Sequence, residues 1–217
     1  DVPCSCNAAL YWVSMPGLTA EGVPARSSLD NYYCDANYVG GVACYELDTF
    51  EANQNVMQVT AHQCEGEPNG YNPSCDRAGV SRSTQKLDIA GVLSRPMCAS
   101  DECVVDTRRP FRVSQRFVVD ASGTLVAIEN EVRQVNASFA FSSADPGIGN
   151  MTEYLRGMSG AMRDGMVLAF QVWGGRWALT SWLDAWTRDP LLCSPGESCP
   201  ESSRVVYSDI AIDSLSG

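Results

Sequence analysis

Residues 44–62 read Cys-Tyr-Glu-Leu-Asp-Thr-Phe-Glu-Ala-Asn-Gln-Asn-Val-Met-Gln-Val-Thr-Ala-His, and they predict two neighbouring β-strands, 44–51 and 56–62. Side chains alternate between the two faces of a strand, so Glu46 and Asp48 share a face. Glu51 would point the other way on a regular strand, but a β-bulge of one inserted residue would return it to that face. The stretch therefore predicts three carboxylates on one face of a sheet.

Such a grouping is costly, because like charges repel each other and lose hydration when they are brought together. A glycosidase, however, needs a pair of carboxyl groups that face one substrate. His62, the only histidine of the chain, ends the second predicted strand. Two structural interpretations stay open: a solvated outer sheet face would also carry carboxylates, and a lone histidine is more often structural than catalytic.

The 217 residues predict one β-rich domain, 1–217, because 45% hydrophobic content suits a single core and no linker or repeat interrupts the chain. Two alternating stretches on either side of Ala121-Ser122-Gly123 predict a hairpin. The strands predicted outside 44–62 are 8–15, 111–120, 125–135, 166–173 and 205–212. Residues 153–164 are the one stretch with helical composition, whereas 16–43 and 63–86 are expected to form loops.

The composition excludes several classes of partner. A net charge of −11 argues against binding to nucleic acid or to an anionic membrane, and suits a neutral polymer. No run approaches the ~18 apolar residues of a transmembrane helix. Ten cysteines indicate an oxidising compartment and hence secretion. A zinc site is not expected, because Cys4 and Cys6 are too close for the usual ligand spacing. Asn136 and Asn150 begin glycosylation sequons, which fit secretion.

Glu-Leu-Asp-Thr-Phe-Glu-Ala-Asn at 46–53, followed by Thr-Ala-His-Gln-Cys at 60–64, resembles the active-site signature of glycoside hydrolase family 7. That family contains cellobiohydrolases and endoglucanases, and its pattern is Glu-x-Asp-x-x-Glu-Ala/Gly-Asn, then Thr-Pro-His-x-Cys. Residues 4–15, 33–35, 165–173 and 181–184 also resemble family segments. The resemblance implies an all-β, concanavalin A-like jelly-roll sandwich with curved antiparallel sheets and a concave substrate cleft.

The resemblance also implies roles for single residues. Glu46 takes the position of the nucleophile, Glu51 that of the acid/base, and Asp48 that of the carboxylate that holds the nucleophile. The positions implied for substrate binding are those of His62, Asn7, Tyr11, Tyr33, Trp173 and Trp182. The tryptophans would stack on sugar rings, which present C–H groups to a flat aromatic face. The implied reaction is a retaining hydrolysis of β-1,4-glucan that requires no metal and no organic cofactor.

Relatives in this family imply the disulfides as well. Cys34–Cys44, Cys64–Cys75 and Cys4–Cys199 occupy positions that are bridged in the family. The cysteines that are then left predict Cys6–Cys193 and Cys98–Cys103. All ten cysteines would therefore be paired, which makes this a disulfide-stapled sandwich.

Three departures from the family pattern qualify these expectations. The family has a long N-terminal half before the segment that matches Cys4, so the chain is either a minimal relative or the C-terminal portion of a processed enzyme, with a separate polypeptide supplying that half. The connection between Cys34 and Cys44 is short, and Gly70 and Gly196 stand where arginines are common. These features predict an open cleft and endo-type cleavage. The alternatives are a β-1,3 or mixed-linkage glucanase of the same clan, or a non-catalytic protein that binds polysaccharide or builds extracellular structure.

Overall fold

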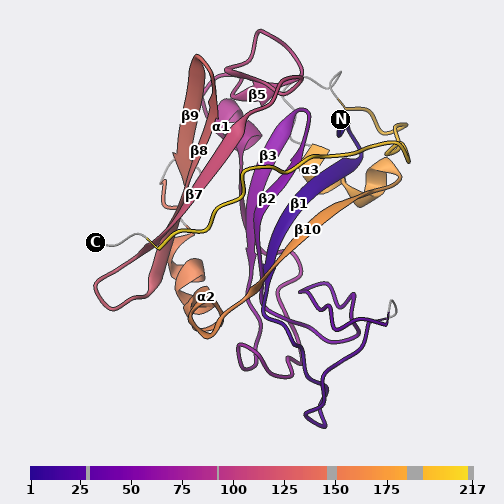
Figure 1. The fold of residues 1–217 in the computed structure, drawn as a ribbon, viewed down its shortest axis with the longest axis vertical. Helices are drawn as coiled ribbons and strands as arrows, with labels where there is room; N and C mark the ends of the chain where they lie inside the picture. Colours follow the sequence, from indigo (N-terminus) through magenta and orange to yellow (C-terminus); the bar gives the residue numbers. More distant parts are fainter. Residues whose placement is uncertain (28–29, 92, 146–150, 185–192, 215–217) are drawn as a thin grey trace.

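The computed structural model describes residues 1–27, 30–91, 93–145, 151–184 and 193–214. Strands dominate this part of the chain, and the helices are short (Figure 1). The elements are, in chain order, β1 (Cys6–Val13), β2 (Glu46–Asn53), β3 (Val56–His62), β4 (Val80–Ser83), α1 (Thr84–Ile89), β5 (Met97–Cys98), β6 (Val105–Asp106), β7 (Arg112–Val119), β8 (Leu125–Gln134), β9 (Ala137–Ser142), α2 (Thr152–Asp164), β10 (Val167–Gly174), η2 (Trp177–Leu179) and α3 (Ser181–Asp184).

Two antiparallel sheets form the body of the molecule. The larger sheet has five strands in the order β10-β1-β2-β3-β4, and the smaller one has three in the order β7-β8-β9. A short parallel pair, β5 and β6, pairs with neither sheet but contributes Met97 and Val105 to the hydrophobic core. Figure 1 shows the smaller sheet beside β2 and β3, with α2 at one end. No helix among the described residues is long and apolar enough to cross a membrane.

The two sheets face each other across one hydrophobic core, which makes the fold a β-sandwich. Leu47 of β2 and Val59 of β3 are fully buried in the same cluster as Ile128 of β8. Trp12 of β1 reaches across to the smaller sheet, where it meets Phe117 of β7 edge-on with 6.3 Å between the ring centroids. Removal of this apolar surface from water is the main term that holds the sheets together. The predicted all-β antiparallel sandwich is thus confirmed.

Most of the predicted elements are present, with ends displaced by two residues at most. The strand predicted at 205–212 is wrong, because this segment is extended but forms no ladder with any described residue. Side chains in this segment alternate because the segment packs against the protein on one side only. The ring centroids of Tyr207 and Phe170 are 5.4 Å apart, whereas Val206 is 85% exposed. The loop predicted at 63–86 ends early, since β4 and α1 begin within it, and β9 was not predicted.

The structure contains the three predicted short-range disulfides, Cys34–Cys44, Cys64–Cys75 and Cys98–Cys103. The two long-range predictions, Cys4–Cys199 and Cys6–Cys193, are wrong because the partners are exchanged. The bonds are Cys4–Cys193 and Cys6–Cys199.

The backbone around residue 5 explains the exchange. Cys6 begins β1 opposite Gly174, and the amide of Cys199 donates to the carbonyl of Gly175, so these two cysteines lie side by side. Ser5 has a φ of 65°, in the left-handed region, and this turn directs Cys4 away from Cys6. Sequence spacing could not show that turn.

The contributions of the two long-range disulfides to the free energy of unfolding should overlap. These bonds close loops of nearly equal length, with sequence separations of 189 and 193 residues. Replacing all four cysteines with serine should lower the free energy of unfolding by about 5 kcal/mol on the loop-entropy account. Removing one pair alone should cost much less, because the remaining bond still constrains almost the same loop. Denaturant unfolding of the three variants, after peptide mapping of the pairing, measures this; equal costs for one pair and for both would contradict it.

Candidate active site

A bulge in β2 places the three carboxyl groups on one face of the larger sheet. On β1, Leu10 pairs with Phe50 and Tyr11 with Asp48, so Thr49 has no partner there. The same irregularity appears against β3 between Asp48 and Glu51. Glu51 therefore faces the same way as Asp48, opposite to the core side that Leu47 occupies. The face that results is the candidate active site.

Glu51 is held by three hydrogen-bond donors from two neighbouring strands. Its Oε1 accepts from Asn7 Nδ2 at 2.9 Å and from the phenol of Tyr11 at 3.0 Å. Its Oε2 accepts from Thr60 Oγ1 of β3 at 3.3 Å. The oxygen of Tyr11 in turn accepts the indole N–H of Trp173 at 2.7 Å. Two predicted substrate-binding residues thus contact the predicted acid/base directly, and a third contacts it through Tyr11.

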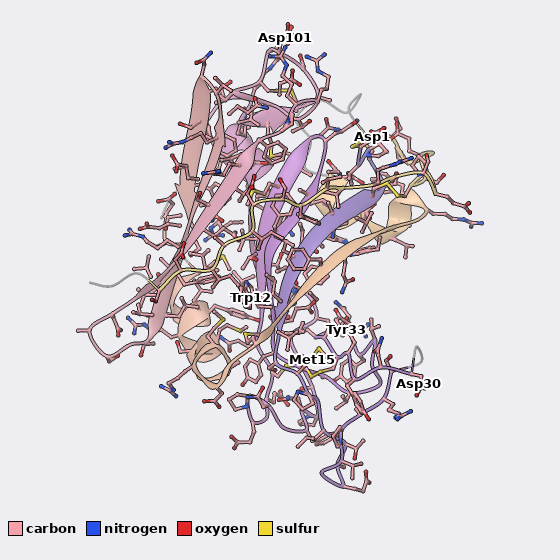
Figure 2. All side chains as sticks on the ribbon, viewed as in Figure 1. Asp1, Trp12, Met15, Asp30, Tyr33 and Asp101 are labelled. Carbon is pink, nitrogen blue, oxygen red and sulfur yellow. A yellow bond between two sulfur atoms is a disulfide. The ribbon has the colours of Figure 1, made fainter. Side chains whose placement is uncertain are left out.

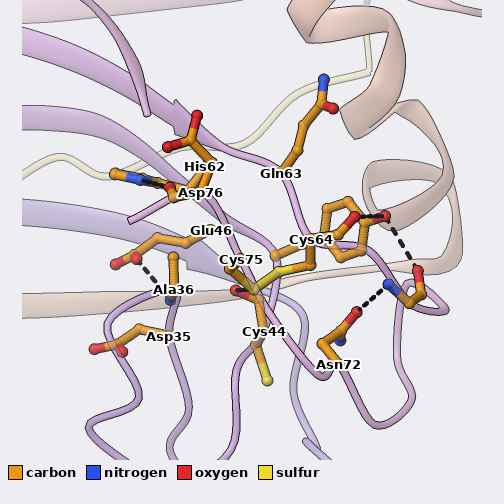
Figure 3. Close-up of a disulfide and its surroundings, with 12 residues drawn as sticks. Asp35, Ala36, Cys44, Glu46, His62, Gln63, Cys64, Asn72, Cys75 and Asp76 are labelled. Carbon is orange, nitrogen blue, oxygen red and sulfur yellow. Dashed lines mark hydrogen bonds between the residues drawn. A yellow bond between two sulfur atoms is a disulfide. The ribbon is translucent and has the colours of Figure 1, made fainter. Parts of the chain in front are cut away.

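Asp48 is hydrogen-bonded to His62, the only histidine of the sequence. His62 lies opposite Glu46 across the β2–β3 ladder, and its Nε2 is 3.0 Å from Asp48 Oδ2. Both side chains are buried. Glu46 has a single backbone donor, the amide of Ala36 in the loop before β2, at 3.0 Å from its Oε2 (Figure 3). The structure therefore brings Glu46, Asp48, Glu51 and His62 into one buried cluster.

Burial raises the pKa of all three carboxyl groups. For Glu46 the charge of Asp48 adds to the effect of burial, and for Asp48 the charge of Glu51 does so. Burial also raises the pKa of Glu51, but the hydrogen bonds from Tyr11 and Asn7 oppose the rise because they favour the charged form. The cluster therefore holds protons at pH values where exposed carboxyl groups are ionised.

The remaining predicted substrate-binding residues lie at the edges of this face. Tyr33 packs with Met15 against the cluster that contains Tyr11 and Val13 (Figure 2), and burial followed by the charge of Glu46 raises its pKa. Trp173 and Trp182 stand next to each other, with ring centroids 6.4 Å apart and planes tilted by 35°. The indole N–H of Trp182 donates a hydrogen bond to the carbonyl of Leu179 at 3.0 Å.

Sequence reasoning missed several contributors to the site. Thr60 lies two residues before His62, so the period of a strand already placed it on the same face. Asp35, whose charge helps to raise the pKa of Glu46, follows Tyr33 in a segment that resembles the family. Nothing in the sequence indicated Ala36, because it contributes a backbone amide. Asn136 is exposed at the β8–β9 turn, and Asn150 lies outside the described residues.

Glu46, Asp48 and His62 offer potential ligand atoms within 4.8 Å of one another, close enough to hold a cation. Part of this group is already hydrogen-bonded, since Asp48 Oδ2 bonds to His62 Nε2 and Glu46 Oε2 accepts from the amide of Ala36. We therefore describe the group as a set of carboxyl and imidazole groups that share protons, and we assign no metal to it.

The buried carboxyl groups should reduce stability as pH rises. A folded-state pKa above the unfolded value means that the unfolded chain ionises first, so the penalty is absent below the unfolded pKa, about 4, and grows above it. Glu46→Gln, which cannot ionise, should therefore unfold at a higher temperature than the wild type at pH 7. The difference should shrink at pH 4. Thermal unfolding at both pH values measures this, and a difference that does not depend on pH would contradict it.

Known proteins resemble this chain in sequence over nearly its whole length. It is 28% identical to endoglucanase type C of Fusarium oxysporum, over 99% of this chain and 60% of the relative. It is 27% identical to endoglucanase EG-1 of Humicola insolens, over 93% of this chain and 54% of the relative. The chain thus spans less than two thirds of the length of these curated relatives. No family model matches the sequence.

Solved structures share the fold. An endoglucanase I complexed with cellobiose superposes with a TM-score of 0.62 at 22% identity, over 83% of this chain and 56% of that one. A GH7 family cellobiohydrolase from Daphnia pulex gives a TM-score of 0.61 at 21% identity, over 91% of this chain and 60% of that one. The resemblance to glycoside hydrolase family 7 is thus confirmed: the chain is similar in sequence to endoglucanases, shares the fold of solved structures that include a GH7 family cellobiohydrolase, and spans little more than half of the length of these proteins.

Proposed function

We propose that this protein hydrolyses β-1,4-glucan with retention of configuration. The observation that carries the proposal is the cluster of three buried carboxyl groups on one sheet face, in which Glu51 is held by donors and Asp48 is bonded to His62. A carboxyl oxygen of Glu46 attacks the anomeric carbon, and the bond to the leaving oxygen breaks as Glu51 protonates it. Glu51 then takes a proton from water, and the water oxygen displaces Glu46 from the sugar.

The reaction requires a proton on Glu51, whereas the hydrogen bonds of the free site favour the charged form of this glutamate. Burial raises the pKa of both glutamates, but donors from Asn7, Tyr11 and Thr60 oppose the rise at Glu51, whereas Glu46 accepts one backbone amide. Asn7 and Tyr11 are also the residues that the resemblance assigns to sugar binding. A bound sugar would compete for their hydrogen bonds, which would raise the pKa of Glu51 and transfer the proton to the acid/base.

The substrate class is supported by the relatives, several of which are named endo-β-1,4-glucanases or endoglucanases. The short Cys34–Cys44 connection and the glycines at 70 and 196 support a cleft that is open at its ends, and therefore endo-type cleavage. A β-1,3 or mixed-linkage glucan is the alternative substrate. Five disulfides support secretion, because such bonds persist in oxidising compartments.

A separate polypeptide that supplies the N-terminal half of the family fold remains part of the proposal. It is motivated by the length of the relatives, of which this chain spans 60% or less in the examples above. Intact mass of purified material under reducing conditions would reveal such a polypeptide. A non-catalytic binding protein is distinguished from the enzyme by activity alone.

Activity on soluble β-glucans should depend on both glutamates. Glu51→Gln should lower kcat by about 10²–10⁴-fold on glucan, which has a poor leaving group and needs the acid. The loss should be much smaller on an aryl cellobioside, whose leaving group departs without a proton, whereas Glu46→Gln should abolish turnover of both substrates. Proton NMR of the first product should show the β-anomer, and viscosity should fall early.

The wild type serves as the reference. Glu129→Gln is the matched control, because it replaces an exposed carboxyl group on the smaller sheet. Inactive wild-type protein on every β-glucan would end the enzymatic interpretation. An α-anomer as first product would replace retention by inversion.

The two tryptophans should differ in their kinetic effects. Trp182→Ala removes an aromatic surface and should raise KM by roughly 5- to 30-fold with kcat unchanged. Trp173→Ala also removes the N–H that polarises the Tyr11 phenol beside Glu51, so it should lower kcat as well. Trp173→Phe, which keeps an aromatic face but lacks the N–H, separates these contributions. Identical kinetic profiles for Trp173→Ala and Trp182→Ala would contradict the connection to Glu51.

A further inference from the structure

His62 is enclosed on the side away from Asp48 by the turn 75–79, which follows the Cys64–Cys75 disulfide (Figure 3). The main-chain carbonyl of Asp76 lies 2.8 Å from His62 Nδ1. Gly79 of the same turn lies against the same edge of the ring: a Cβ at this position would lie 2.7 Å from both Cε1 and Nδ1 of His62. Because φ is +62° at Gly79, the turn itself also favours glycine.

The carbonyl of Asp76 determines which histidine nitrogen carries a proton. A carbonyl oxygen only accepts hydrogen bonds, so Nδ1 must be protonated. One further proton is then shared between Nε2 and Asp48 Oδ2, as an imidazolium with a carboxylate or as a neutral ring with a carboxylic acid. The other oxygen of Asp48, Oδ1, is buried without a hydrogen-bond partner among the described residues. His62 is therefore the hydrogen-bonded anchor of Asp48.

The turn is fastened to the end of β3 by a side chain from helix α2. The hydroxyl of Tyr154 accepts the amide of Gln63 at 3.0 Å and donates to Asp76 Oδ2 at 2.8 Å. The other carboxyl oxygen of Asp76 accepts the amides of Ala78 and Gly79 at 3.2 and 3.0 Å. One phenol thus connects the residue after His62 to the residue whose carbonyl holds the ring.

We propose that Tyr154 and Asp76 are positioning residues of the active site, which hold His62 in one tautomer and orientation and thereby hold Asp48 against Glu46. Tyr154 belongs to α2, which packs on the hydrophobic core, and its hydroxyl acts on His62 through the amide of Gln63 and the carboxyl group of Asp76. The kinetic part of this inference rests on the proposed hydrolase function, whereas the structural part does not.

The charges around His62 give the direction of the expected effect. Glu46, Asp48 and Glu51 of β2 and Asp76 of the turn surround the ring, and Asp35 lies on the far side of Glu46. A positive charge on His62 lowers the pKa of both Glu46 and Glu51. If the Nδ1–H loses its acceptor, the charged ring is less favoured, and both glutamates should ionise at higher pH.

Tyr154→Phe tests the proposal, because it removes the hydroxyl and keeps the ring in the core. The matched control is Tyr45→Phe, which removes a phenol that contacts the same disulfide loop. This phenol donates to the carbonyls of Cys64 and Gly66, at 2.8 and 3.2 Å, and makes no hydrogen bond to Asp76 among the described residues. The chain has one histidine, so protein labelled with ¹⁵N- and ¹³C-histidine and purified without a histidine tag gives a single set of imidazole signals. Those signals report tautomer and ring position whether or not the protein is active.

Wild-type protein should show an Nδ1–H in a hydrogen bond. Tyr154→Phe should shift the imidazole signals, lower kcat about 10-fold with KM little changed, and move both limbs of the pH–rate profile up by about half a unit. Tyr45→Phe should leave the signals and both limbs in place, even if it lowers thermal stability. Gly79→Ala, which presses on the ring from the turn, should shift the imidazole signals too.

Unchanged His62 signals and pH limbs in Tyr154→Phe, or equal changes in Tyr45→Phe, would overturn the proposal. If the wild type hydrolyses no β-glucan, the proposed function fails, and the imidazole signals alone then decide the positioning role.

Discussion

The bulge at Thr49 is the constraint on which the site depends, and the opposite sheet stabilises it. The side-chain amide of Gln115 on β7 donates to the carbonyl of Thr49 and also to Asn130 Oδ1 of β8 at 2.7 Å. Asn130 is buried, so this polar pair occupies space that apolar side chains would otherwise fill. Without the bulge, Glu51 would point into that core as a buried carboxyl group with no donors. The sandwich and the site therefore depend on the same irregularity.

The site places acidic groups where they are least well hydrated, and their neighbours offset part of that cost. Glu51 has its donors on adjacent strands, so the sheet's own register supplies them. Asp48 depends on His62, which depends on a carbonyl in a disulfide-bounded turn. Moving outward from Asp48, each hydrogen-bond partner is held more rigidly than the one before: first the imidazole ring of His62, then a main-chain carbonyl. This ordering keeps the carboxyl groups close together, and none of their hydrogen-bond partners among the described residues is an arginine or a lysine.

One end of the larger sheet carries the two tryptophans and the long-range disulfides. Cys6–Cys199 joins the start of β1 to the segment beyond β10, close to Trp173. Asp184, at the end of α3, accepts hydrogen bonds from the Ser5 amide at 3.0 Å and from Asn53 Nδ2 at 2.6 Å. The short helix that carries Trp182 is thereby tied both to the N-terminal turn and to the end of β2. The positions of the two tryptophans are thus set by buried polar contacts as well as by apolar packing.

The sequence by itself determined most of the long strands and the carboxylate face, because alternation with period two follows directly from strand geometry and the spacing of Glu46, Asp48 and Glu51 required a bulge. It did not determine contacts that depend on backbone groups or on distant segments: the carbonyl of Asp76 at His62, the amide of Ala36 at Glu46, or the turn at Ser5 that exchanged the two long-range disulfides. Backbone donors and acceptors are the same at almost every residue, so sequence carries no signal for them. Only the tertiary structure decides which of them meet a side chain.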